Sequence, residues 1–106
     1  MPLMVASIGL LLLSGSSAVR ADTKCPARPD DAAAAKRLAS QWWRQAVAHY
    51  QAGRDVEAIG AWQCAYRLAP HPKALFNIGR SAERAGKLAL ALRSYEAYLR
   101  AMPGAS

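Results

Sequence analysis

The sequence predicts an all-α fold, in which two tandem helix-turn-helix units form a short α-solenoid after an N-terminal signal peptide. Three observations predict it. Apolar residues recur at helical spacing in four segments, short breaks containing Gly and Pro separate these segments, and the last two segments repeat the pattern of the first two. No alternating run of β-branched residues indicates a strand.

The first part of the chain, residues 1–21, has the composition of a secretory signal peptide. The run Leu3–Leu13 is apolar apart from one Ser and one Gly, and small polar residues follow it. Val19 and Ala21 occupy the two positions that a signal peptidase reads, so we expect cleavage between Ala21 and Asp22. The run is about a dozen residues long, whereas a membrane-spanning helix needs roughly 20. We therefore expect an exported protein, periplasmic or secreted, with an N-terminal anchor in the inner membrane as the alternative.

An extended lead-in is expected over residues 22–30, because Pro26 and Pro29 occur there without helical periodicity. The helical domain is expected over residues 31–103. Residues 104–106 then form a short tail.

Four helices are expected in this domain. Asp30 or Asp31 is placed to act as the N-cap of the first helix, ahead of an alanine run that favours helix. Gly supplies the backbone conformation that ends a helix, and Pro cannot continue one, so both residues mark helix ends. Because the connections are short, successive helices form two antiparallel pairs. The four stops are Gly53, Pro70, Gly86 and Pro103.

A constant shift along the sequence aligns the second helix pair, at about 72–103, with the first, at about 39–70. Few residues are identical, but size classes recur. Small residues let two helices approach closely, and aromatic residues fill the space between successive pairs. The aligned positions are Trp42 with Leu75, Trp43 with Phe76, Gly53 with Gly86, Ala58 with Ala91, Trp62 with Tyr95, and Pro70 with Pro103.

At these positions the chain resembles the tetratricopeptide repeat family, whose pattern W-x2-L-G-x2-Y…A-x3-F…P extends over about 34 residues. The resemblance covers about Ala39 to Pro103. The string from Leu75 to Gly79 is similar to repeat modules of exported proteins from the Gram-negative bacterial envelope. The first copy departs from the pattern at Gln45, and the repeat is slightly shorter than that of the family, by a single position.

The resemblance implies a protein–protein interaction module without enzymatic activity. In this family the first helix of each pair lines a groove that binds peptides or partner proteins, so the expected partner is a protein or peptide of the cell envelope. The alternative for Trp43 and Phe76 is packing against neighbouring helices, since an aromatic stripe at helical spacing also builds cores. The groove positions implied on this chain are Trp43, Val47, Tyr50, Lys73, Phe76, Asn77 and Arg80.

The charge balance favours anionic partners. Cleavage after Ala21 removes only Arg20 from the charged residues, which leaves 13 Lys and Arg against 7 Asp and Glu, a formal charge of +6. Export and the even spread of these cations argue against nucleic acid as the partner. The alternative function is a basic binder of an anionic membrane surface or envelope polymer, using Arg67, Arg93 and Arg100. Binding of that kind weakens with salt, which distinguishes it from groove binding.

The chain has two cysteines, Cys25 and Cys64. In an oxidising compartment they can form a disulfide, and the sequence leaves this pairing and two independent thiols as alternatives. Their spacing is not that of a zinc site, so no metal is expected. No Gly-rich phosphate loop is present, and we expect no cofactor.

The residues also argue against an enzyme. Asp55 and Glu57 lie together at a helix start, where interaction with the helix dipole is a sufficient explanation. His49 is expected within the first helix pair and His71 in a turn that contains proline. These groups form no set of nucleophile, base and orienting residue, so neither catalysis nor a small-molecule substrate is expected.

The last helix contains more apolar residues than one core-facing stripe needs. Repeats of this kind bury their faces only against neighbours, and at least three repeats are normally needed. We therefore expect an apolar edge near the C-terminus that is covered by self-association through the last helix or by a partner. Its residues are Leu88, Leu92, Tyr95, Tyr98, Leu99 and Met102. The alternative is a truncated gene product that misfolds by itself.

Overall fold

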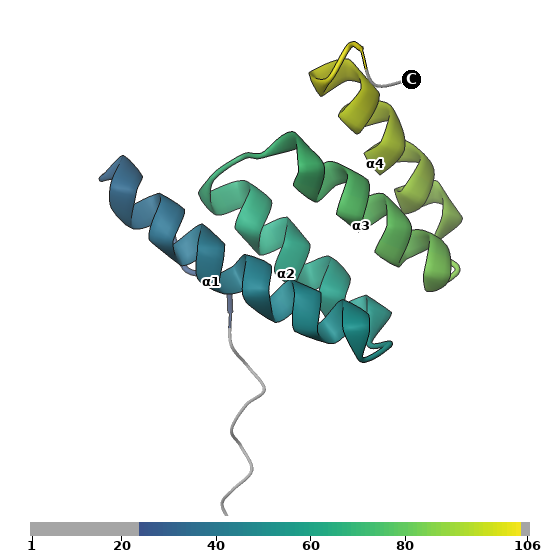
Figure 1. Cartoon of the computed structure of the whole chain (residues 1–106), viewed down its shortest axis with the longest axis horizontal. Coiled ribbons are helices and arrows are strands. Elements are labelled where there is room, and N and C mark those ends of the chain that lie inside the picture. Colours follow the sequence, from purple (N-terminus) through teal and green to yellow (C-terminus); the bar gives the residue numbers. More distant parts are fainter. Residues whose placement is uncertain (1–23, 105–106) are drawn as a thin grey trace, which may run out of the picture.

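The computed structural model describes residues 24–104, and all regular secondary structure in that range is α-helical. The helices are α1 (Ala32–Gln51), α2 (Asp55–Leu68), α3 (Pro72–Arg84) and α4 (Leu88–Ala101). They pack in chain order as two helical hairpins, with α2 against α3 between the hairpins (Figure 1). The prediction of an all-α fold with four helices is confirmed.

The expected signal peptide over residues 1–21 and its cleavage site between Ala21 and Asp22 lie outside the described residues. Within residues 24–104, no helix combines the length and the apolar character that crossing a membrane requires.

Asp31, rather than Asp30, caps the first helix. Its Oδ2 accepts a hydrogen bond from the backbone N–H of Ala34 at 3.0 Å. This bond satisfies one of the N–H groups that have no partner within the helix. The alanine run then continues into α1, and three alanines of α1, Ala35, Ala39 and Ala46, are buried. Small side chains at these positions allow α1 and α2 to pack closely.

Both hairpins turn in the same way. Gly53 and Gly86 follow α1 and α3 with φ angles of 78° and 77°, a left-handed conformation that is costly for residues with a Cβ atom. The next N–H group bonds back across the turn in each case, from Arg54 to the carbonyl of His49 and from Lys87 to that of Ala82, both at 2.8 Å. Helices α2 and α4 begin and end at equivalent positions of the repeat, so the sequence repeat is also a repeat of backbone structure.

The main core lies between α1, α2 and α3. It includes the buried Trp62 of α2, together with Ile59, Ile78 and Ala82. A second, smaller cluster lies toward the start of α1 and the end of α2, and it contains Leu68. The short connection to α3 contains Pro70, and Pro72 occupies the first turn of α3, where a missing N–H group is tolerated.

A disulfide joins Cys25 in the lead-in to Cys64 in α2. Cys64 is buried beside Ala39 and Leu68, and Cys25 packs against the same cluster. The bond therefore holds the extended segment before α1 against the first hairpin. A disulfide of this kind fits an oxidising compartment outside the cytoplasm.

Candidate functional site

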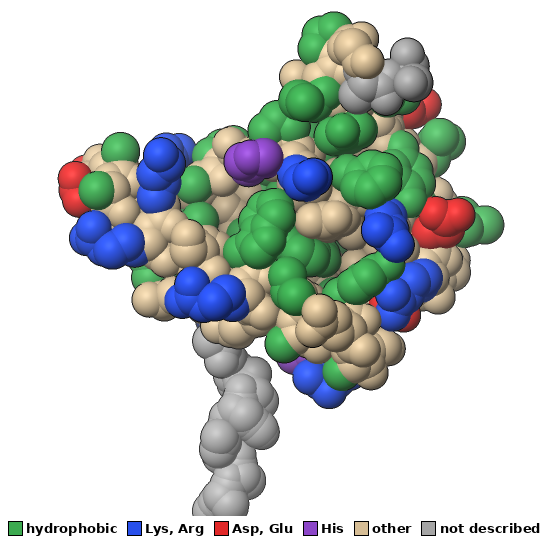
Figure 2. Space-filling model, in the orientation of Figure 1, with side chains coloured by type: hydrophobic (Ala, Val, Ile, Leu, Met, Phe, Trp, Pro, Cys, Tyr) green, Lys and Arg blue, Asp and Glu red, His purple; other side chains and the backbone are tan. Residues whose placement is uncertain are grey.

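One side of the molecule is formed by side chains of α1 and α3, and we call it the α1–α3 face. Figure 2 shows hydrophobic side chains gathered over these two helices, with Lys and Arg side chains among them. The spacing of the residues in each helix is three or four positions, with one adjacent pair, which keeps them on one side. The face comprises Trp43, Val47, Tyr50, Lys73, Phe76, Asn77 and Arg80.

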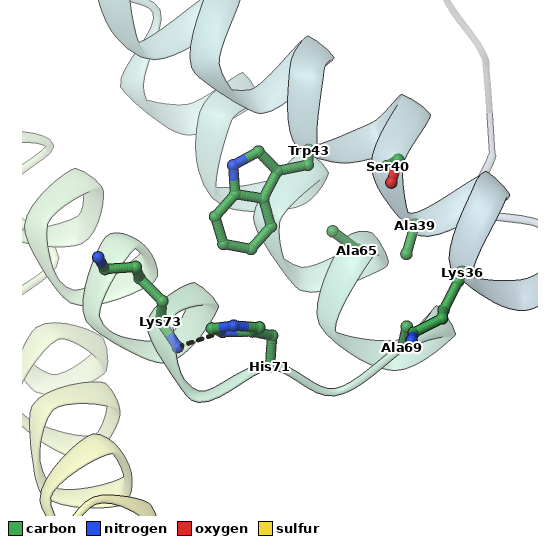
Figure 3. Close-up of a pocket in the computed structure, with 8 residues that line it drawn as sticks. All are labelled: Lys36, Ala39, Ser40, Trp43, Ala65, Ala69, His71 and Lys73. Carbon is green, nitrogen blue, oxygen red and sulfur yellow. Dashed lines mark hydrogen bonds between the residues drawn. The ribbon is translucent and has the colours of Figure 1, made fainter.

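A pocket of about 370 Å³ opens at the end of this face where α1 meets the α2–α3 connection. Figure 3 shows the indole of Trp43 reaching from α1 toward His71, on the other side of the pocket. The alanines Ala39, Ala65 and Ala69 contribute small side chains to the lining, which leaves the space open. Of the described residues that line the pocket none is acidic, and two are lysines, Lys36 and Lys73.

His71 is held in a defined orientation. Its Nδ1 accepts a hydrogen bond from the backbone N–H of Lys73 at 3.1 Å, so the side chain caps α3 (Figure 3). The neutral imidazole then carries its proton on Nε2. The His71 ring lies 5.9 Å from the ring of Trp43 at an angle of 72°, an edge-to-face arrangement. One wall of the pocket is therefore fixed by a helix cap.

At the other end of the face, Arg80 connects the two hairpins. Its guanidinium carbon lies 5.4 Å from the ring centroid of Tyr50 in α1 and 5.9 Å from that of Phe76 in α3. A cation between two aromatic rings is attracted to both of their faces. Arg80 is nevertheless exposed, so its charge remains accessible to a ligand.

Arg84 reinforces this junction from one turn further along α3. Its guanidinium carbon lies 3.9 Å from the ring centroid of Tyr50, and its Nη2 donates a hydrogen bond to the Tyr50 carbonyl at 3.1 Å. The same nitrogen lies 2.9 Å from a carboxylate oxygen of Asp55 at the start of α2. Arg84 thus ties α3 to both helices of the first hairpin.

The two aromatic residues whose role the sequence left open both pack and remain half-exposed. The Trp43 ring meets the buried Trp62 edge-to-face, with centroids 4.8 Å apart. Phe76 packs against Tyr95 and Tyr98 of α4, with centroids 5.7 and 5.3 Å away. Packing on one side therefore holds each ring while another side stays open to solvent.

No family model, no curated protein and no solved structure matches the chain.

The structure brings the predicted positions together as two groups, Trp43 with Lys73 at the pocket and Tyr50 with Phe76 and Arg80 at the junction. Val47 and Asn77, the remaining predicted positions, are half-buried. Within residues 24–104, no group of three or more His, Cys, Asp or Glu side chains is arranged to hold a metal ion.

Besides the alanines of the pocket lining, four polar residues of this region were not among the positions predicted from the sequence. Lys36 and Ser40 continue the stripe of Trp43 toward the start of α1 at the same helical spacing, so extending that stripe by two turns would have found them. His71 could have been found as the residue before a proline at a helix start. Nothing in the sequence placed Arg84 beside Tyr50, because they are separated by 34 positions.

Proposed function

We propose that the protein is a non-enzymatic interaction module of the tetratricopeptide repeat type, which binds a segment of a partner polypeptide along the α1–α3 face. The proposal places it in an exported protein, periplasmic or secreted, where the disulfide between Cys25 and Cys64 is stable.

The repeat assignment draws support from the backbone. The two hairpins share the left-handed glycine at the turn, and their second helices have equal length. In arrays of this type each unit packs on its neighbour, and the first helices line one continuous surface. The packing of α2 against α3 agrees with this arrangement.

The observation that carries the proposal is the row of half-exposed aromatic rings that crosses from one hairpin to the other. Trp43, Tyr50 and Phe76 are each held by packing or cation–π contacts and each remain partly open. Rings that are already ordered offer large apolar area at low entropic cost, which is the property of residues that dominate binding energy. A surface built in this way suits an extended or helical peptide better than a small molecule.

The charges define the class of peptide. Lys36 and Lys73 lie at the pocket and Arg80 lies further along the face, all exposed. Complementary charge steers association and selects the register of a ligand. The expected ligand therefore places one apolar side chain in the pocket beside Trp43 and acidic side chains near these cations.

A test is to select peptides that bind the purified protein from a random displayed library and to measure their affinity by titration. We expect an apolar residue flanked by Asp or Glu in the selected sequences. Charge reversal by Lys36→Glu with Lys73→Glu should weaken binding roughly tenfold or more, about 1.4 kcal/mol. Both lysines are exposed, so the fold should be unchanged. The matched control is Arg44→Glu, an exposed position of α1 outside the pocket lining.

The alternative function, binding to an anionic membrane surface or polymer, predicts another pattern. The protein would then bind vesicles containing anionic lipid at low salt and dissociate from them at moderate salt. Substitution of Arg67, Arg93 and Arg100, which are all exposed, would abolish that binding, and Lys36 with Lys73 would matter less. If the selection yields no peptide consensus and the protein binds anionic vesicles in a salt-sensitive way, peptide binding along the α1–α3 face is rejected in favour of the alternative function.

A further inference from the structure

A stripe of exposed apolar side chains runs along α4. Leu88, Leu92, Leu99 and the capping residue Met102 are 66%, 59%, 42% and 42% exposed. With the half-exposed Tyr95 included, the spacing along the chain alternates regularly between four and three positions. Side chains at this spacing lie on one side of a helix. We call these five residues the α4 stripe, and hydrophobic side chains are visible over α4 in Figure 2.

The repeat shows what kind of surface the α4 stripe is. The counterpart of Leu92 in the first repeat is Ile59, which is 6% exposed because it lies in the core that α3 completes. The counterpart of Leu88 is Asp55, which pairs with Arg84 of α3. The α4 stripe therefore occupies the positions by which α2 packs against α3. A helix packed on α4 as α3 packs on α2 would cover it.

Helix α1 of a second copy is not suited to cover the α4 stripe in the way that α3 covers α2. The positions by which α3 is buried include Ala74, Ile78 and Ser81. Their counterparts in α1, at the equivalent positions of the first repeat, are Gln41, Gln45 and Ala48, and all three are exposed. Two polar glutamines cap the stack at this end. Head-to-tail stacking of copies, α1 on α4, is therefore disfavoured.

The α4 stripe is complementary to itself when two copies of the helix run antiparallel. With Leu92 opposite Tyr95 of the second copy, Leu88 faces Leu99 of the second copy, because Leu88 precedes Leu92 by four positions and Leu99 follows Tyr95 by four. Antiparallel helices with such a seam bury it by knobs-into-holes packing. We propose that the protein forms a two-fold symmetric dimer through an antiparallel pairing of α4 with α4 of a second copy.

The charges beside the stripe fit the same register. Arg93 and Glu96 are both exposed and lie on the same flank of the stripe. The antiparallel pairing brings Glu96 of one copy near Arg93 of the other, and two-fold symmetry makes this contact twice. Opposite charges at the edge of an apolar seam set orientation and partner choice. The inference does not depend on the α1–α3 face, which lies on other helices.

The test is sedimentation of the purified protein over a wide concentration range. We expect a reversible monomer–dimer equilibrium that Leu92→Glu weakens roughly tenfold or more, since the substitution removes a buried leucine from both sides of the seam. The matched control is Val56→Glu. Val56 is 60% exposed at the start of α2, away from the α4 stripe, and its replacement should leave the equilibrium unchanged.

Charge exchange tests the orientation. Arg93→Glu and Glu96→Arg should each weaken the dimer, and the double variant Arg93→Glu with Glu96→Arg should restore it, because the pair is re-formed with reversed signs. Helical content measured by circular dichroism reports whether each variant is folded. A protein that stays monomeric at all concentrations, or a dimer that Leu92→Glu leaves intact, overturns the proposal. The Lys36→Glu with Lys73→Glu variant should dimerise normally whether or not it binds peptide.

Discussion

The ring of Tyr95 lies directly against the backbone of Gly79. A Cβ atom at residue 79 would be 2.6 Å from Cε1 and 2.7 Å from Cδ1 of that ring, far inside van der Waals contact. The ring cannot easily withdraw, because it packs against Phe76 and its hydroxyl donates a hydrogen bond to Glu83 at 2.8 Å. This contact sets how closely α3 and α4 approach.

Gly79→Ala should therefore destabilise the protein by about 1–2 kcal/mol, since overpacking outweighs the gain in helix propensity. The free energy of unfolding in urea measures it. Gly60→Ala is the control, because nothing lies within 4 Å of a Cβ at that position of α2, and it should stabilise by about 0.5–1 kcal/mol. In a Tyr95→Ala background, Gly79→Ala should no longer destabilise. If Gly79→Ala lowers the free energy of unfolding equally in both backgrounds, the contact with the Tyr95 ring is not the cause of the destabilisation.

Arg84 should contribute more to stability than other exposed arginines. Arg84→Ala removes the contact with the Tyr50 ring, the bond to its carbonyl and the ion pair with Asp55, and we expect a larger loss of stability than for an arginine without such contacts. Arg84→Lys should recover little, because an ammonium group does not reproduce the planar contacts. Arg44→Ala, on the exposed part of α1, should change stability by less than about 0.5 kcal/mol. Chemical denaturation of the three variants measures these differences in the free energy of unfolding.

Reduction of the disulfide should lower stability. The bond joins residues 39 positions apart, and closing a loop of that size stabilises the folded state by about 4 kcal/mol in the chain-entropy description. The midpoint of thermal unfolding should therefore fall when a reductant is added. The variant with Cys25→Ala and Cys64→Ala should already be destabilised and should not respond to reductant. A response in that variant would mean that the reductant acts elsewhere.

Tyr95 should titrate unusually late. Burial, and secondly its hydrogen bond to Glu83, raise the pKa of Tyr95 to about 12 from the ordinary 10.0. Because the folded state favours the neutral phenol, this contribution to stability is complete below pH 10 and is lost as pH rises through 12. Absorbance of tyrosinate near 295 nm should show a late step that Tyr95→Phe removes and Tyr66→Phe leaves in place. A wild-type curve with no step above pH 11 would contradict the assignment.

Local signals in the sequence were sufficient for the helices. The stop at Gly53 and its counterpart at Gly86 depend on the conformation of one residue and on hydrogen bonds that reach back five positions. The cap at Asp31 depends on an atom three residues away. The choice between Asp30 and Asp31 needed the structure, because both can cap and only the path of the lead-in distinguishes them.

The candidate site was predictable in part. The helical spacing of Trp43, Val47 and Tyr50 shows that they share one side of α1, but spacing alone does not show how far each is exposed. That depends on the depth at which α1 lies on α2, hence on contacts such as Trp43 with Trp62. The pocket was not predictable, because His71 enters it from a connection whose direction is set by the packing of the second hairpin.

By itself, the sequence determined the class of fold, the four helices, their stops and the repeat of one helix pair by the next, because all of these follow from interactions within one or two helical turns. Only the tertiary structure decided that Cys25 meets Cys64, that Arg84 joins both helices of the first hairpin, and that Leu92 of α4 is exposed while its counterpart Ile59 in α2 is buried. These outcomes depend on distances between segments far apart in the chain. Such distances follow from how helices of given size and shape pack together.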